Sequence, residues 1–240
     1  MAIDSKGNLF IIDSFRLRKI TPQGEVTTIA GNGLPKAVDG KGVNAGFWTP
    51  SGMVCDANDN IILTEFANSL IRKITPDGTV TTLCRTDDQF QYRDGPLANA
   101  GFRFPAGICI NSKGDLFVAD QLNNRIRKIS NELVSTFAGS GEDGYADGRG
   151  VKAKFSQPER IVVDRYDNLY VSETLFGSSR LRVISPEGEV STVIGSHQKG
   201  FKDGSVAGSK FDIIRNLVID NQQNLYIMDD YNSLIRKISR

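Results

Sequence analysis

The sequence predicts an all-β protein built from five copies of one structural unit. Runs related to Leu-Ile-Arg-Lys-Ile recur through the chain, and a repeat of this length is the first feature to examine in a sequence. The apolar residue that precedes the arginine falls at five positions, which are Leu17, Ile71, Ile126, Leu181 and Ile235. These positions are 54 or 55 residues apart, and no helical periodicity competes with the pattern.

Each unit contains short apolar runs that are separated by turn sequences such as TPDG and SPEG. The runs are rich in Val, Ile, Thr, Phe and Tyr, which is typical of β-strands joined by tight turns, and a full unit has four of them. The second run, for example residues 61–63, is continuously apolar and predicts burial on both faces, whereas the fourth alternates. A four-stranded unit that is buried on both faces and repeated predicts a blade of a β-propeller.

We expect one domain over residues 1–240, and the segments between its units have a fixed spacing of their own. The five units cover approximately 1–31, 51–85, 106–139, 159–195 and 215–240. Each connector contains Asp-Gly, at 39–40, 94–95, 147–148 and 203–204. Eight residues after each Asp comes a phenylalanine, at Phe47, Phe102, Phe155 and Phe211. We expect the glycine to form a turn and the phenylalanine to fill the seam between neighbouring blades.

The segment DGKGVNAGFWTPSGMVCDANDNIILTEFANSLIRKITPDGTVTTL, residues 39–83, resembles an NHL repeat. The resemblance extends over essentially the whole chain, and it depends on a Pro-x-Gly start, an Asn-Leu-Tyr/Phe run that ends in a carboxylate, and Arg-Ile-Arg-Lys-Ile in this order. It implies a β-propeller, usually of six blades, and a binding role, since one fold hosts many functions. Some members of the family bind RNA.

The fifth unit contains only the first three runs, because Arg240 follows its third run directly. Two expectations follow from this arrangement. The five units form either a closed ring whose last blade lacks its outer strand or an incomplete six-bladed propeller, and the family resemblance favours the second. The basic residues Arg236, Lys237 and Arg240 along the third run would discourage edge-to-edge pairing of strands.

A carboxylate ends the second run of every unit, and these residues are the candidate metal ligands. They are Asp13, Glu65, Asp120, Glu173 and Asp229. Oxygen ligands suit Ca²⁺, so a metal-dependent hydrolase or lactonase is the alternative function. Their presence in every unit instead favours a structural role, in which each accepts backbone N–H bonds or pairs with an arginine. We therefore expect no metal or other cofactor.

Composition argues against several other function classes. The 29 basic and 28 acidic residues give a formal charge of +1, and the side chains of a repeated pair such as Arg72-Lys73 point to opposite faces of a strand. Nucleic-acid binding is therefore not expected. The only histidine is His197, so a zinc site built from histidines is excluded and the commonest general base is scarce. The sequence has no long apolar run that could span a membrane. Three cysteines without metal-ligand spacing suggest a cytoplasmic protein.

The differences between units suggest a binding surface. In the fourth and fifth units Arg160 and Arg215 lie where the strand start is otherwise small, and aromatic residues occupy several loops after the second run. Aromatic and arginine side chains are typical anchors of protein interfaces. The candidate binding residues are Trp48, Phe66, Asn68, Leu122, Asn124, Arg160, Phe176, Arg215 and Tyr231. We predict a non-catalytic scaffold that recruits a protein or peptide. The alternative is that the loop aromatics fold back over neighbouring blades.

Overall fold

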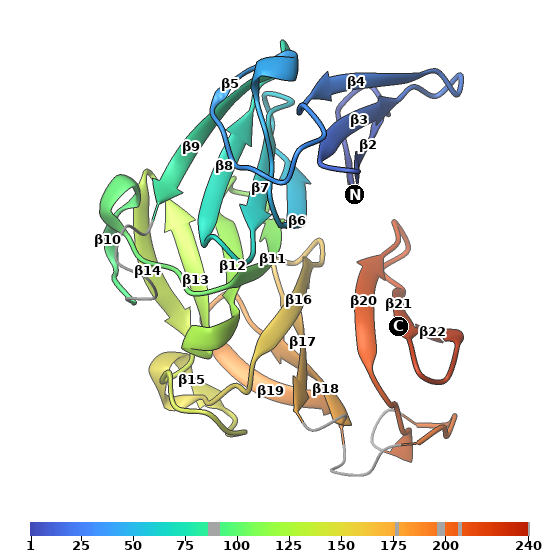
Figure 1. Cartoon of the computed structure of the whole chain (residues 1–240). Coiled ribbons are helices and arrows are strands. Elements are labelled where there is room, and N and C mark those ends of the chain that lie inside the picture. Colours follow the sequence, from blue (N-terminus) through green and yellow to red (C-terminus); the bar gives the residue numbers. More distant parts are fainter. Residues whose placement is uncertain (86–91, 176–177, 196–199, 206–207, 240) are drawn as a thin grey trace. The chain divides into compact units, whose positions relative to one another are not determined.

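The computed structural model describes residues 1–85, 92–175, 178–195, 200–205 and 208–239. Every repeat forms one antiparallel sheet, so the predicted all-β fold with five propeller blades is confirmed (Figure 1). Two predicted features, His197 and Phe176, lie outside the described residues. The only described helices are four 3-10 helices of three residues each. None of them is long and apolar enough to cross a membrane.

The chain divides into two compact units. Unit 1 consists of Met1–Leu116 and Ile129–Val134, and unit 2 consists of Phe117–Lys128 and Ser135–Arg240. The expectation of a single domain stays a prediction.

Unit 1 holds the first two sheets. Sheet 1 has the order β1-β2-β3-β4, with β1 (Ala2–Ile3), β2 (Leu9–Asp13), β3 (Arg16–Ile20) and β4 (Val26–Ala30). Sheet 2 has the order β5-β9-β8-β7-β6, with β5 (Gly40–Lys41), β6 (Pro50–Cys55), β7 (Ile61–Glu65), β8 (Leu70–Ile74) and β9 (Thr79–Arg85). The fifth strand, β5, was not predicted. It comes from the Asp-Gly connector, and Gly40 pairs with Val80 of β9.

Sheet 3 also has five strands, and its residues are divided between the two units. Its strands are β10 (Gly95–Pro96), β11 (Pro105–Ile110), β12 (Leu116–Asp120), β13 (Arg125–Ser130) and β14 (Leu133–Ala138). Within unit 1, Gly95 of the connector pairs with Val134, as Gly40 pairs with Val80 in sheet 2.

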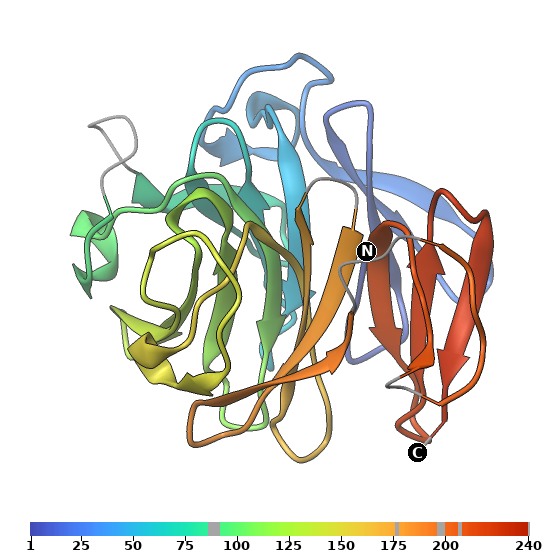
Figure 2. The same ribbon diagram turned by 90° about the horizontal axis from the view of Figure 1, so that it is seen from below.

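Unit 2 holds sheets 4 and 5. Sheet 4 has the order β15-β19-β18-β17-β16, with β15 (Gly148–Arg149), β16 (Pro158–Val163), β17 (Leu169–Leu175), β18 (Ser178–Ile184) and β19 (Glu189–Ile194). Sheet 5 has three described strands in the order β20-β21-β22, with β20 (Ile214–Ile219), β21 (Leu225–Asp229) and β22 (Leu234–Ile238). These strands appear in red in Figure 2.

The apolar core fills the seams between neighbouring sheets, as the repeat pattern predicted. In unit 1, Phe47 is fully buried and packs in one cluster with Leu17 of sheet 1 and Leu63 of sheet 2. In unit 2, Phe211 packs with Leu181 of sheet 4 and residues of sheet 5. The connector phenylalanines therefore fill the seams. Strand β7 is buried along its whole length, whereas β2 and β21 are buried only in part.

Candidate functional site

A buried arginine ties the second and third strands together in sheets 2, 3, 4 and 5. In sheet 2, Arg72 Nη1 lies 2.6 Å from Glu65 Oε1, and both side chains are fully buried. The same pair recurs as Asp120–Arg127 at 2.7 Å, Glu173–Arg182 at 2.6 Å and Asp229–Arg236 at 3.1 Å. Arg72, Arg182 and Arg236 also bond to groups outside their own strands. The repeated basic pairs are thus split, with Arg72 inside the blade and Lys73 half-buried.

The Asp-Gly connector supplies a second carboxylate to the same arginine. Asp39 Oδ1 lies 2.9 Å from Arg72 Nη2, and Asp147 Oδ1 lies 2.7 Å from Arg182 Nη2. Asp39 also accepts bonds from the backbone N–H of Thr82, at 3.0 Å, and from its hydroxyl, at 2.8 Å. Burial alone would raise the pKa of Asp39, but the bonds from Thr82 and the charge of Arg72 outweigh it and hold the pKa below its usual value. Hydrogen bonds therefore join the connector to the outer strand of the following blade.

The carboxylates at the ends of the second strands also accept backbone N–H bonds from the connectors. Ser156 N donates to Glu173 Oε2 at 2.7 Å, and Asp212 N donates to Asp229 Oδ1 at 3.1 Å. Burial raises the pKa of Glu173, and Arg182 offsets this only in part. Among the described residues, no three His, Cys, Asp or Glu side chains come together in a way that could hold a metal ion. In sheets 2 to 5, the carboxylate oxygens that would serve as metal ligands are paired with arginines instead.

An asparagine three residues after the carboxylate completes this arrangement. Asn68 and Asn232 donate to Glu65 and Asp229. In sheet 3 the corresponding residue is Asn123, whose Nδ2 lies 2.8 Å from Asp120 Oδ2. The sequence-based choice of Asn124 missed this residue, although counting three positions from Asp120 would have found it. Asn124 instead has a positive φ of 51° and accepts a bond from Gln157 N.

Two candidate binding residues of unit 1 differ in their surroundings. The ring of Phe66 packs edge-on against Phe104 with centroids 4.9 Å apart, so this aromatic folds over the next connector. Trp48 remains 45% exposed. Its backbone N–H donates to Glu65 Oε2 at 3.4 Å.

Unit 2 brings three candidate binding residues into one polar cluster. Arg160 Nε donates to the backbone carbonyl of Arg215 at 3.2 Å, and the Arg215 side chain pairs with Asp230 Oδ2 at 3.1 Å. Glu159 pairs with Arg160 at 3.3 Å. Tyr231 follows Asp230 directly and is 70% exposed. Leu122 and Asn124, also in this unit, are half-buried.

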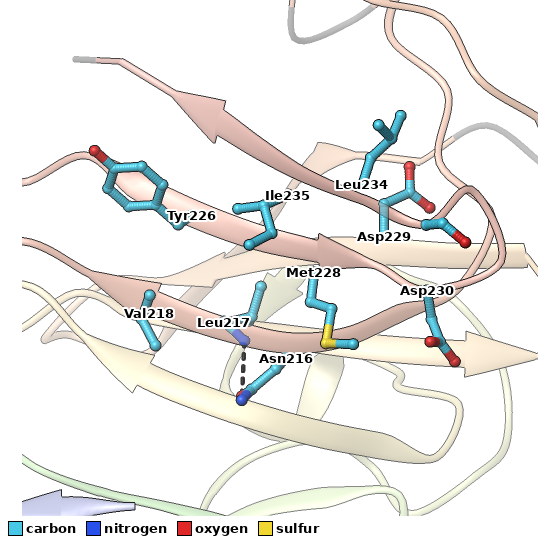
Figure 3. A pocket seen from close by; sticks show the side chains of 10 residues that line it. Asn216, Leu217, Val218, Tyr226, Met228, Asp229, Asp230, Leu234 and Ile235 are labelled. Carbon is cyan, nitrogen blue, oxygen red and sulfur yellow. Dashed lines mark hydrogen bonds between the residues drawn. The ribbon is translucent and has the colours of Figure 1, made fainter.

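An apolar groove lies beside this cluster on one face of sheet 5. Its cavity has a volume of about 490 Å³, and side chains from β20, β21 and β22 line it (Figure 3). Ile235 is 79% exposed and Met228, its cross-strand partner, is 45% exposed. We call the exposed Val218, Met228 and Ile235, together with Tyr226, the sheet 5 face. Sequence reasoning missed this surface, because the repeat pattern predicts Ile235 to be as buried as Ile71.

Comparison with known proteins agrees with the repeat assignment. The NHL repeat family model matches residues 102–129. Human NHL repeat-containing protein 2 is 32% identical over 98 residues, which cover 40% of this chain and 14% of that protein. These findings confirm the predicted resemblance to NHL-repeat β-propellers. The first curated relatives are much longer than this chain, which spans 10–14% of their lengths.

Solved structures of two propellers show the same fold. An auxiliary nutrient binding protein from Bacteroides ovatus superposes with a TM-score of 0.72 at 18% identity, over 99% of this chain and 57% of that one. A putative gluconolactonase superposes with a TM-score of 0.62 at 15% identity, over 99% of this chain and 72% of that one. At these identities the similarity establishes the fold alone.

Proposed function

We propose that this chain is a non-catalytic binding module that recruits a protein or peptide through the sheet 5 face and the loop cluster beside it. The observation that carries the proposal is the exposure of Ile235, at 79%, and of Met228, at 45%. The corresponding residues of sheet 2, Ile71 and Thr64, are both fully buried. An apolar surface of this kind on a stable sheet is a common sign of an interaction site.

The surroundings of the groove have the composition of an interface rim. The exposed Tyr231 and the Arg215–Asp230 pair lie at one end of the strands that line it. Tyrosine and arginine are enriched at protein interfaces and among the residues that contribute most of the binding energy there. The expected partner is a protein segment that presents apolar side chains to β20–β22.

Charge in the cluster supports a protein partner over a nucleic acid. Arg160 pairs with Glu159 and Arg215 pairs with Asp230, so the two cations are balanced by two carboxylates. A phosphate backbone is recognised by uncompensated lysine and arginine side chains. Binding of RNA is therefore not proposed.

The engagement of the carboxylates likewise disfavours the hydrolase alternative. Glu65, Asp120, Glu173 and Asp229 each face a buried arginine within 3.1 Å. A bound Ca²⁺ would need these oxygens and would compete with a fixed guanidinium for them.

Selection from a random displayed-peptide library tests the proposal. Peptides enriched on the wild-type chain should bind the Ile235→Lys and Tyr231→Ala variants about tenfold more weakly, because each substitution removes one contact worth about 1.4 kcal/mol. Val151→Lys is the matched control, since Val151 is 61% exposed in the connector before sheet 4. Enriched peptides that bind all three variants as well as they bind the wild type would refute the proposed site.

A further inference from the structure

The connector after β4 contains the only Asn-Gly pair in the chain, Asn32-Gly33. In such a pair the backbone nitrogen of the glycine can attack the side-chain amide of the asparagine, because glycine has no Cβ to shield that nitrogen and its backbone turns freely. Both residues keep part of their surface exposed, so water reaches them. The pair belongs to unit 1 and is separate from the sheet 5 face.

A hydrogen bond polarises the side-chain carbonyl of Asn32. The backbone N–H of Leu34 donates to Asn32 Oδ1 at 2.9 Å. This bond from the second residue after an asparagine is a common feature of turns. When a nucleophile attacks the carbonyl carbon, Cγ, negative charge develops on Oδ1, and a donor that is already in place stabilises this charge. The turn therefore makes the amide of Asn32 more reactive.

The attacking and leaving nitrogens are not engaged in other bonds. In the part of the chain that the structure describes, neither the N–H of Gly33 nor Nδ2 of Asn32 has a hydrogen-bond partner. The amide of Asn32 lies beside Gly46, where a Cβ would be 3.4 Å from Nδ2 and 3.5 Å from Oδ1. A backbone N–H in a hydrogen bond must lose that bond before its nitrogen can attack. No such cost opposes the reaction at Gly33.

The guanidinium of Arg16 lies against the peptide bond between these two residues. Its Nη2 donates to the backbone carbonyl of Asn32 at 3.3 Å, and its Nη1 donates to that of Ser14 at 3.4 Å. A Cβ at residue 33 would overlap the guanidinium, and Gly33 has a φ of 80°, so only glycine fits. The nitrogen of this peptide bond must lose its proton in order to attack Cγ. A fixed positive charge beside a group favours its deprotonated form.

The equivalent turn after β14 forms without an asparagine. Ser140 occupies the position of Asn32, and its Oγ accepts a bond from the backbone N–H of Glu142 at 3.1 Å. Arg125 Nη2 donates to the backbone carbonyl of Ser140 at 2.7 Å, as Arg16 does to that of Asn32. The glycine that follows also has a positive φ, of 91°. The turn therefore needs a polar side chain before the glycine, but it does not need an amide.

We propose that Asn32 is a site of spontaneous modification, at which the folded chain converts the asparagine to isoaspartate and aspartate. The nitrogen of Gly33 gives its proton to water and bonds to Cγ of Asn32. The bond from Cγ to Nδ2 breaks, and Nδ2 takes a proton from water and leaves as ammonia. A second water then opens the resulting succinimide at either carbonyl. One opening gives aspartate, and the other gives isoaspartate, in which the backbone runs through Cβ and Cγ.

Both products change the connector between sheets 1 and 2. Each places a new carboxylate beside Arg16, and isoaspartate also lengthens the backbone by one carbon. The turn lies between two backbone hydrogen bonds, from Gly31 N to Gly42 O at 3.0 Å and from Val38 N to Gly46 O at 3.0 Å. A longer backbone between these bonds cannot satisfy both with the same geometry. The isoaspartate form should therefore exchange its Gly31 and Val38 amide hydrogens faster than the original form.

Incubation of the purified chain at pH 8, followed by proteolysis and mass spectrometry, tests the inference. We expect the peptide that contains Asn32 to gain the mass of an amide-to-carboxylate replacement, with isoaspartate identified by electron-transfer fragmentation. Conversion should be at least as fast as in AGNGLPKAV, a blocked peptide with the sequence of residues 30–38. The Asn32→Ser variant should lose the modification. The Ser140→Asn variant should gain a second site, because Arg125 and the N–H of Glu142 are already in place there.

Two results would overturn the inference. One is slower conversion of Asn32 in the folded chain than in the blocked peptide, because the fold would then protect the amide. The other is a Ser140→Asn variant that stays unmodified at residue 140 while Asn32 converts, because the shared turn and its arginine would then not promote the reaction. The Ile235→Lys variant should convert at the wild-type rate, and peptides selected on the sheet 5 face should still bind Asn32→Ser. The inference and the proposed function can therefore fail separately.

Discussion

Arg72 and Glu65 form an ion pair inside sheet 2, with 2.6 Å between Nη1 and Oε1 and neither side chain exposed. The guanidinium also lies 2.9 Å from Asp39 of the connector. One arginine thus joins the second strand, the third strand and the connector of its repeat. Truncation of one member of a fully buried pair leaves an uncompensated charge in the interior, and its cost is far larger than that of an exposed pair.

The Arg72→Ala variant should accordingly lose about 3–5 kcal/mol of unfolding free energy, measured by urea denaturation. Arg18→Ala is the matched control. Arg18 lies 3.5 Å from Asp13, and their side chains are 30% and 53% exposed. This substitution should cost less than about 1 kcal/mol. Equal losses in the two variants would show that the buried pair has no special role.

Acid should weaken the bonds that the connector aspartates make with the outer strands and the buried arginines. The pKa values of Asp39 and Asp147 are lowered from the usual aspartate value in the folded chain, because bonds from Thr82 and Thr192 and from the arginines outweigh the effect of burial. A lowered pKa means that the stabilisation is fully present above the unfolded value and is lost as the pH falls through the folded value. The Asp39→Asn/Asp147→Asn double variant should be less stable than the wild type at pH 6. This difference should shrink toward about pH 3 in denaturation curves, whereas a pH-independent difference would contradict the account.

Thiol chemistry should be slow in the native protein. Burial raises the pKa of Cys55 to about 11, with further contributions from the nearby Asp59, Asp56 and Asp4. Burial also raises the pKa of Cys109. Since the thiolate is the reactive form, iodoacetamide at pH 8 should label these two thiols much faster in urea than under native conditions. Rapid native labelling of Cys55, located by mass spectrometry, would contradict this placement.

Calcium should not stabilise the chain. The carboxylates Glu65, Glu173 and Asp229 are already bonded to arginines and to backbone N–H groups, as Glu173 is to Arg182 and Ser156. A ligand that binds only the folded state raises its melting temperature. We therefore expect the same melting temperature with Ca²⁺ and with EDTA. A rise with Ca²⁺ that EDTA reverses would instead favour the hydrolase or lactonase alternative.

Most of the fold could be predicted, because the same order of strands and turns recurs in five repeats and each repeat supports the same assignment. The period of two residues along a strand predicts that each Arg-Lys pair is divided between two faces. The period of about 55 residues predicts the strands and the connector phenylalanines of every repeat. The connector strands β5, β10 and β15 were missed, since two residues such as Gly40–Lys41 carry no alternating pattern. The carboxylates were located correctly, but their arginine partners depend on register, which a single sequence does not give.

The candidate binding surface was predicted less well than the fold. Arg160 and Arg215 were found because they break the repeat, and the structure brings them together at one backbone carbonyl. Phe66 packs on Phe104, in the manner of the alternative in which the loop aromatics fold back, and its role in binding stays a prediction. The exposure of Ile235 could not be predicted, because its sequence context matches that of buried counterparts such as Ile71. Exposure depends on which neighbours are present, and this is a tertiary property.

The most direct test of the account is hydrogen–deuterium exchange of the chain with and without a peptide selected on it. The account predicts that the peptide slows exchange in β20–β22 and in the loop that carries Tyr231, while strands β6–β8 of unit 1 exchange as before. Protection confined to β6–β8, around Glu65 and Arg72, with none in sheet 5 would contradict it.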